Sequence, residues 1–188
     1  MWTPRGRHDD SAPWNVLVTG QEGVAGDLLR QLKKLGRFRW AGFRNVIIGQ
    51  VDDVEAFLQT LQDLMEQKPF VEAWLGKAVP IDATFQFSAE EFLADVEREL
   101  TPFLDRLAGR TFYVRVERRG HKGVLRTAEI EQEIGAFLVR ALTERGHSPK
   151  VKFDDPDVVL DVEILGDRAG ISLITRELRT RFTSVKIR

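Results

Sequence analysis

Positively charged residues gather in one short stretch of the sequence. Between Arg110 and Thr127 there are six lysine and arginine residues but one acidic residue, Glu117. Arginine can donate two parallel hydrogen bonds to phosphate oxygens, and lysine adds a compact point charge. The composition of this stretch is typical of an anion-binding site. The alternative is a solvated turn whose cations pair with Glu117 and Glu129.

The charge of the whole chain hides this local excess. Residues 109–188 carry 16 basic and 12 acidic residues, a net of +4, whereas residues 1–108 carry 12 and 17, a net of −5, and the two sum to −1. Local potential steers a polyanion more than total charge does. A basic surface is therefore expected in the C-terminal half.

A second motif has the spacing of a phosphate-binding turn. A short apolar strand is followed by Gly20, Gly23 and Gly26 and then by a helical pattern, which resembles the nucleotide-binding turn of short-chain dehydrogenases. Those enzymes need several parallel βαβ units and a Tyr-x-x-x-Lys pair. Here the single tyrosine, Tyr113, is followed four residues later by Glu117. The sequence therefore favours a tight strand-to-helix turn that uses glycine for backbone freedom.

Composition excludes several other classes of protein. The chain has no cysteine, so it can form neither disulfides nor thiolate metal sites, and three scattered histidines (His8, His121 and His147) do not suggest zinc. No apolar run reaches the length of a membrane span, and residues 1–13 lack the apolar core of a secretory signal. We expect residues 1–13 to form a flexible tail and the protein to be cytoplasmic.

The hydrophobic pattern divides the rest of the chain into two α+β units. Strand–helix–strand followed by helix–strand in residues 14–87 predicts a ferredoxin-like domain, with helices on one face of an antiparallel sheet. Its expected elements are a strand at 15–19, a helix at 24–35, a strand at 43–51, a helix from Asp52 or Asp53 to Pro69, and a strand between Ala73 and Phe87 broken at Pro80.

Residues 88–188 predict a mixed sheet with helices packed on it. The expected elements are a helix that opens with a capping box at 88–91, breaks near Pro102 and ends at Gly109; a strand at 112–118; a helix capped by Thr127 and ended by Gly146; strands at 150–153, 158–165 and 171–175; and a last strand at 185–187. Residues 154–157 (DDPD) are expected to form a turn, braced by aspartates that bond their own backbone.

Three motifs in this second unit resemble, in order, those of a THUMP domain. They are 112–122 (FYVRVERRGHK), 153–157 (FDDPD) and 162–173 (VEILGDRAGISL). Residues 14–87 resemble, more weakly, the ferredoxin-like domain that accompanies THUMP domains in tRNA-modifying proteins. The likeness extends from Trp14 to Lys186, and is to stand-alone THUMP proteins that act as tRNA-binding adaptors for cytidine N4-acetylation.

The resemblance implies that the pair of domains grips the acceptor end of tRNA while a separate enzyme modifies a nucleotide at a distance. Most THUMP proteins carry a methyltransferase, deaminase or thiolation domain on the same chain, and none is recognised here, so we expect no catalytic residues and no cofactor. Matching positions imply RNA contacts at Arg115, Arg118, Arg119, His121, Lys122, Arg126, Arg168 and Ser172, and charge alone adds Arg176, Arg179 and Arg181. His121 is expected to donate a hydrogen bond or to stack.

The sequence thus supports three hypotheses from different classes. The first is a non-catalytic adaptor that binds the acceptor stem and 3′ single-stranded end of tRNA. The second is a small nucleotide-binding enzyme that uses the turn from Gly20 to Gly26. The third is a protein-interaction module whose basic turn docks an acidic partner. Replacing Gly23 and Gly26 tests the second, whereas replacing Arg118, Arg119 and Lys122 tests the first when RNA is the ligand.

Overall fold

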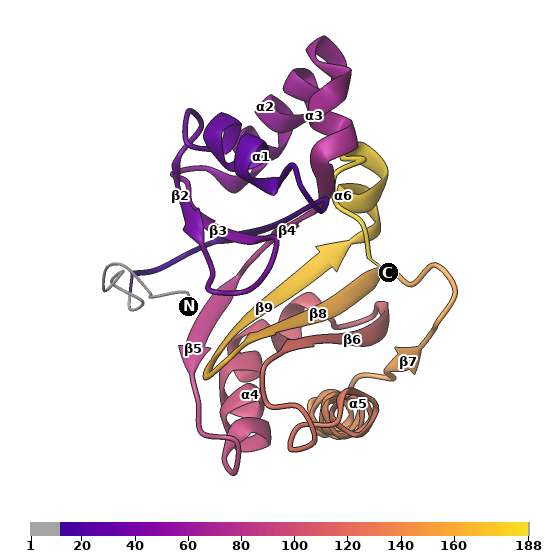
Figure 1. The fold of residues 1–188 in the computed structure, drawn as a ribbon. Helices are drawn as coiled ribbons and strands as arrows, with labels where there is room; N and C mark the ends of the chain where they lie inside the picture. The colour runs from indigo at the N-terminus through magenta and orange to yellow at the C-terminus, as the bar shows by residue number, and fades with distance from the viewer. Residues whose placement is uncertain (1–11, 188) are drawn as a thin grey trace.

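The computed structural model describes residues 12–187, which form two β-sheets with helices packed against them (Figure 1). The predicted tail, residues 1–13, lies almost entirely outside this range. The first sheet has the order β2-β3-β1-β4 and contains β1 (Val16–Gly20), β2 (Arg37–Trp40), β3 (Val46–Gln50) and β4 (Leu75–Pro80). Its helices are α1 (Ala25–Leu32), α2 (Val54–Gln67) and α3 (Pro69–Trp74).

The first unit has the element order β1-α1-β2-β3-α2-α3-β4, which includes the three strands and two helices that the sequence predicted. Every neighbouring pair of strands in its sheet is antiparallel. Figure 1 shows α1, α2 and α3 together on one side of the sheet. The carboxylate of Asp53 caps α2 by accepting a hydrogen bond from the backbone N–H of Ala56, 2.9 Å away, which confirms the expected start of that helix.

Two elements of the first unit were not predicted. Strand β2 (RFRW) does alternate charged and apolar residues, but over four residues only, and of its two apolar side chains Phe38 is buried while Trp40 is exposed. Helix α3 begins directly at Pro69 and has six residues, too few for a helical period to be visible in the sequence.

The second sheet is mixed, as expected. Its order is β5-β9-β8-β6-β7, with β5 (Ala83–Gln86), β6 (Thr111–Arg119), β7 (Lys150–Val151), β8 (Val158–Leu165) and β9 (Arg168–Thr175). Strand β6 runs parallel to β8, and α5 (Thr127–Glu144) makes the connection between them on one face of the sheet. The remaining helices are α4 (Phe92–Leu100), the 3-10 helix η1 (Thr101–Arg106) and α6 (Arg176–Arg181).

The two faces of the second sheet are both covered. The alternating side chains Phe112, Val114 and Val116 pack toward α4 and α5, as predicted. All eight residues of β8 are buried, including Asp161 and Glu163 on the opposite face. Figure 1 shows why: the second sheet lies between α4 and α5 on one side and the first unit on the other.

Both predicted helix caps in the second unit are wrong. Helix α4 begins at Phe92 without a side-chain cap, because the backbone carbonyl of Ser88 accepts from the N–H of Glu91 in a separate turn. Helix α5 begins at Thr127 itself, with Arg126 in extended backbone before it. The break near Pro102 is confirmed, since η1 begins at Thr101.

The C-terminal segment also differs from the prediction. No strand forms at 185–187; α6 follows β9 instead, capped by the hydroxyl of Thr175, which accepts from the N–H of Leu178. Beyond α6, Phe182 and Val185 are buried in the core of the first unit. There the backbone N–H of Ala78 donates to the carbonyl of Ser184, at 2.8 Å. The apolar character of residues 185–187 therefore reflects packing between the units.

Strand β5 also links the two units. Strand β5 precedes the predicted boundary near Phe87 but pairs with β9 in the second sheet. That boundary, with a first domain of residues 14–87 and a second of residues 88–188, stays a prediction.

Candidate nucleic-acid interface

The loop that follows β6 has an unusual backbone. Three of its first four residues have positive φ: Gly120 at 97°, His121 at 47° and Gly123 at 84°. The carbonyl of His121 accepts from the N–H groups of Val124 and of Leu125, each at 3.1 Å. A β-carbon at Gly120 would lie 3.1 Å from the α-carbon of Gly166, so this loop packs tightly on the β8–β9 turn. We call residues 118–126 the basic loop.

His121 is held inside the protein by two contacts. Its Nε2 lies 2.7 Å from a carboxylate oxygen of Asp167, and its ring centroid lies 5.6 Å from that of Phe87. The imidazole therefore bonds and packs within the protein, between the basic loop and the β8–β9 turn. These contacts fix the left-handed backbone that turns the loop.

Two cations of the basic loop, Lys122 and Arg126, are exposed, and Arg118 is partly buried. Arg118 donates to the carbonyl of Gly120, and Lys122 is exposed. Arg126 is 71% exposed and pairs with Glu129 at 2.9 Å. Ion pairs in water are weak because solvent screens them. Arg126 can therefore exchange Glu129 for a phosphate at little cost.

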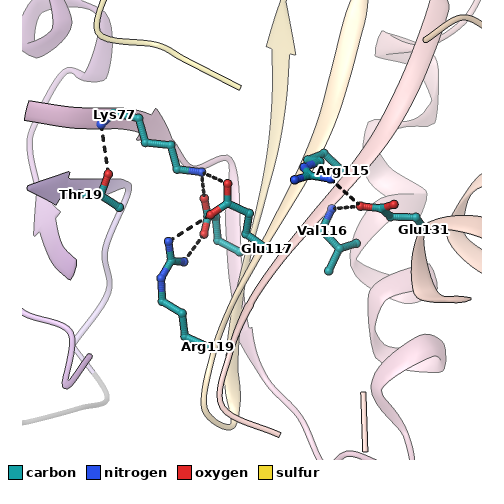
Figure 2. Close-up of polar contacts among 8 residues, drawn as sticks. Thr19, Lys77, Arg115, Val116, Glu117, Arg119 and Glu131 are labelled. Carbon is teal, nitrogen blue, oxygen red and sulfur yellow. Dashed lines mark hydrogen bonds and ion pairs between the residues drawn. The ribbon is translucent and has the colours of Figure 1, made fainter. Parts of the chain in front are cut away.

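Arg119 has a different position. It belongs to an ion-pair cluster between the two units, formed with Lys77 of β4, Glu117 of β6 and Glu163 of β8 (Figure 2). Its guanidinium lies 2.6 Å from Glu163 and 3.1 Å from Glu117. We call these four residues the inter-sheet cluster.

Lys77 is the centre of this cluster. Its ammonium lies 2.8 Å from Glu117 and 2.5 Å from Glu163, whose side chain is fully buried. Its backbone N–H donates to the hydroxyl of Thr19, at 3.1 Å. Burial alone would lower the pKa of Lys77, but the negative charges of Glu163 and Asp161 outweigh it and raise the pKa above its ordinary value.

The pKa values of two carboxyl groups near Lys77, those of Glu117 and Asp161, shift in opposite directions. Burial favours a higher pKa for Glu117, but the hydrogen bond and charge of Lys77 and the charge of Arg119 lower it overall. Asp161 is fully buried, and burial together with the charge of Glu163 raises its pKa well above the ordinary value. Two cations thus face Glu117 and Glu163, with Asp161 beside them in a position that disfavours its charged form.

Two more of the expected RNA contacts lie outside the basic loop. Arg115 lies 3.6 Å from Glu131, which also accepts the backbone N–H of Val116 at 2.9 Å (Figure 2). Ser172 is fully buried, directly opposite Asp161 in the β8–β9 pair. Because side chains alternate along a strand, that of Ser172 lies on the same face as Asp161, toward the first unit and away from the surface.

The remaining predicted cations fall into two places. Arg168, at the start of β9, donates to the carbonyl of Ala12 at 3.3 Å, on the same side as the basic loop. Arg176, Arg179 and Arg181 lie on α6, beyond the opposite end of β9. The structure therefore brings together Arg118, His121, Lys122, Arg126 and Arg168, and separates the three arginines of α6 from them.

The arginines of α6 stabilise the 154–157 turn. Arg176 lies 2.9 Å from both Asp155 and Asp157, and Arg179 bonds the carbonyl of Pro156. Arg181 pairs with Glu55 of α2. The turn does form, but Asp157 accepts from the backbone N–H and hydroxyl of Thr111, both at 2.8 Å, rather than from its own backbone. These two bonds from Thr111 lower the pKa of Asp157.

The glycine-rich turn of the first unit has its own backbone partners. The N–H of Gly20 donates to Asn45 and that of Gln21 to Trp74, at 2.9 and 2.7 Å. A β-carbon on Gly20 would lie 2.7 Å from that of Ala25. Glycine here allows α1 to pack closely on β1, and the N–H groups of Gly20 and Gln21 are used within the fold.

Sequence reasoning missed Glu163 as a partner of Arg119, and Lys77 as the second cation that pairs with Glu117 and Glu163. Lys77 lies in an otherwise apolar strand, Leu75–Pro80. This position was the available signal, because a lysine that is buried with its strand needs carboxylates to pair with. It also missed Arg44, which lines a polar cavity of about 260 Å³ together with Lys77, Glu117 and Arg119.

Comparison with known proteins agrees with this fold. Residues 87–174 match the family model of the THUMP domain. The tRNA sulfurtransferase of Citrobacter koseri is 39% identical over 72 residues, and that of Escherichia coli SMS-3-5 is 36% identical over 72 residues. Each alignment covers 38% of this chain and 14% of the relative, so the chain spans a small part of these proteins.

Solved structures share the fold over a longer range. TrmN from Thermus thermophilus is similar with a TM-score of 0.61 and 21% identity, over 84% of this chain and 44% of that one. A 4-thiouridine synthetase solved in complex with RNA and ATP is similar with a TM-score of 0.56 and 16% identity, over 86% and 41%. The second unit is thus a mixed α+β fold, and its residues 87–174 match the model of the THUMP domain.

None of the helices within residues 12–187 is both long and apolar enough to cross a membrane.

Proposed function

We propose that this protein binds tRNA through the basic loop and presents its acceptor end to a separate modifying enzyme. The carrying observation is the backbone of the loop, which turns at Gly120, His121 and Gly123 and holds Arg118, Lys122 and Arg126 around the start of α5. The THUMP domain supports RNA as the ligand, as do the tRNA sulfurtransferases and the RNA complex among its relatives.

The proposed mechanism is binding without chemistry. Phosphate oxygens accept hydrogen bonds from Arg118 and Arg126 and meet the charge of Lys122, next to the N-terminal N–H groups of α5. Phosphate contacts supply affinity and orientation, and recognition is of shape and of the single-stranded 3′ end. Arg168 lies on the same side, whereas Arg176, Arg179 and Arg181 are tied to other parts of the fold and are left out of the interface.

Binding to total tRNA at two salt concentrations tests this interface. We expect saturable binding that weakens with salt and is lost when the 3′ end is trimmed. Lys122→Ala should lower the slope of log affinity against log salt by about 1, and Arg118→Ala/Lys122→Ala should lower it further.

A matched control is Arg30→Ala/Lys33→Ala, which removes two exposed cations from α1 and its end. If this control weakens tRNA binding as much as the loop variant, the interface is not at the basic loop. If neither trimming nor the loop variant changes binding, the tRNA proposal fails.

The adaptor role needs its own assay. We propose that the partner is a cytidine N4-acetyltransferase, that the chain has no activity of its own, and that it works in the cytoplasm. Purified chain, tRNA and such an enzyme should give more acetylcytidine than enzyme and tRNA alone. An equal yield with and without the chain would contradict the adaptor role while leaving tRNA binding intact.

A further inference from the structure

A groove lies between the start of α4 and the start of α5, beside the basic loop. Its volume is about 380 Å³, and its floor includes the buried side chains of Phe92, Leu125 and Ile130. Two apolar side chains at its border are open to solvent: Val124 is 65% exposed and Leu93 is 36% exposed. These two side chains form an apolar strip that the described residues leave open to solvent, beside the polar side chains of the groove.

The charges around this groove are mostly negative. Glu90, Glu129 and Glu133 line it, and one cation, Arg126, is paired with Glu129. Acidic residues are also favoured at helix starts by the helix dipole, which accounts for Glu90 and Glu129. Glu133 lies in the second turn of α5, where the dipole gives no such advantage.

We propose that this groove docks a protein segment that carries apolar side chains together with lysines or arginines. The apolar strip fits the first property, and the three glutamates fit the second by charge complementarity. The inference rests on the proposed function for the identity of the partner: the segment belongs to the enzyme that modifies the bound RNA.

The position of the groove separates its ligand from RNA. Its glutamates repel phosphates, whereas the basic loop a few residues away attracts them. Arg126 lies at the border of both surfaces, so a segment seated in the groove is adjacent to RNA held by the loop. RNA-modifying enzymes need cationic surfaces of their own, and one of these can bridge the groove and the RNA.

Peptide titration of the isotope-labelled full chain tests the groove without RNA. The probe is an amphipathic peptide of leucine and lysine, about 18 residues long so that it can form a helix, and the comparison peptide has glutamate in place of lysine. We expect the lysine peptide alone to shift the amide signals of Leu93, Val124 and Glu133. Glu90→Lys/Glu133→Lys should weaken its binding about tenfold.

Glu144→Lys is the matched control, because Glu144 is an exposed acid on the same helix but outside the groove. Val124→Ser tests the apolar strip without changing charge, and should weaken binding several-fold. Equal binding of the two peptides, or equal weakening by Glu144→Lys, would overturn the proposal, since either would indicate unspecific attraction.

A parallel titration with tRNA distinguishes this inference from the proposed function. If tRNA shifts the signals of the groove rather than those of the basic loop, the groove belongs to RNA and the inference is overturned. If tRNA does not bind at all while the lysine peptide still docks, the docking groove stands and the proposed function fails.

Discussion

At the scale of single residues, the inter-sheet cluster is the most constrained part of the molecule. Lys77 is buried and its partner Glu163 is fully buried, so each neutralises a charge that the other would leave in a dry interior. Replacing both with apolar groups is often harmless, whereas removing one leaves an uncompensated charge. The cluster therefore ties together residues that the sequence separates by long distances.

Lys77→Met should destabilise the protein by about 3–5 kcal/mol, because Glu163 and Glu117 lose their shared cation. Urea denaturation followed by circular dichroism measures the change. Adding Glu163→Gln to Lys77→Met should restore part of the loss. Lys33→Met, at an exposed position, is the control and should leave the free energy of unfolding nearly unchanged. If Lys77→Met and Lys33→Met lowered it by similar amounts, the role assigned to Lys77 would be contradicted.

Asp161 gives a pH-dependent prediction. Its folded pKa lies well above the ordinary 3.8 because of burial and Glu163. The folded protein then keeps a proton that the unfolded chain releases. Stability from this group is complete below the unfolded pKa and declines as the pH rises toward the folded pKa.

Asp161→Asn has no proton to release, so it should gain stability relative to the wild type as pH rises from about 4 to 7. Urea unfolding at both pH values measures this difference. A constant difference across that range would mean that Asp161 is ionised in the folded protein.

At the scale of elements, the turn from Gly20 to Gly26 is a close-packing device. Gly20 has no room for a β-carbon, whereas Gly26, inside α1, has open space around it. The same residue type, six positions apart, thus has two different roles. In a nucleotide-binding turn, both glycines would be needed so that the backbone could approach the phosphates of the ligand closely.

Gly20→Ala should destabilise the protein by about 1–3 kcal/mol through the clash with Ala25. Gly26→Ala should stabilise it by about 0.5–1 kcal/mol, because alanine favours a helix over glycine. Thermal unfolding of both variants tests this pair. Loss of binding to a nucleotide such as ATP on Gly26→Ala would instead revive the enzyme hypothesis.

Elements with a strong local pattern could be predicted from the sequence. The strand at 158–165 agrees with the prediction to the residue, and α5, with Ile130, Ile134 and Leu138 buried at helical spacing, begins at Thr127 and ends at Glu144, before Gly146. The two helix caps failed because Ser88 and Thr127 have the right residue type but the wrong backbone. Helix α6 was missed because its stability comes from the DDPD turn and α2, far away in sequence.

The location of the candidate site could be predicted from its basic composition, but the residues that its side chains contact could not. The basic run located the loop after β6, since a charge excess is visible in any linear sequence. That Arg119 turns inward to Glu163, or that Ser172 faces a second sheet, depends on how the two units pack. No periodicity carries that information. Whether the eleven proposed residues contact RNA stays a prediction.

At the scale of the whole molecule, the two units share a core. Leu165, Ile174, Phe182 and Val185 from the C-terminal half are buried in the same cluster as the first sheet. The basic loop of one unit and the helices of the other are thereby held in a fixed relation.

Phe182→Ala should destabilise the protein by about 3–5 kcal/mol, because a fully buried aromatic side chain is lost. Hydrogen exchange should show the loss of protection in β1 and β4 as well as in β9. Protection lost in β9 alone would contradict the shared core. Phe153→Ala, at a side chain that is 77% exposed, is the control.

The burial of Phe182 also has a consequence for biosynthesis. Domains generally fold from the N-terminus as the ribosome extends the chain. Here the first unit emerges early, but its core is complete only after Phe182 and Val185 have been synthesised, behind the entire THUMP domain. Until then the nascent chain leaves an apolar face of its first sheet uncovered, and chaperones that bind such faces have a target during that interval.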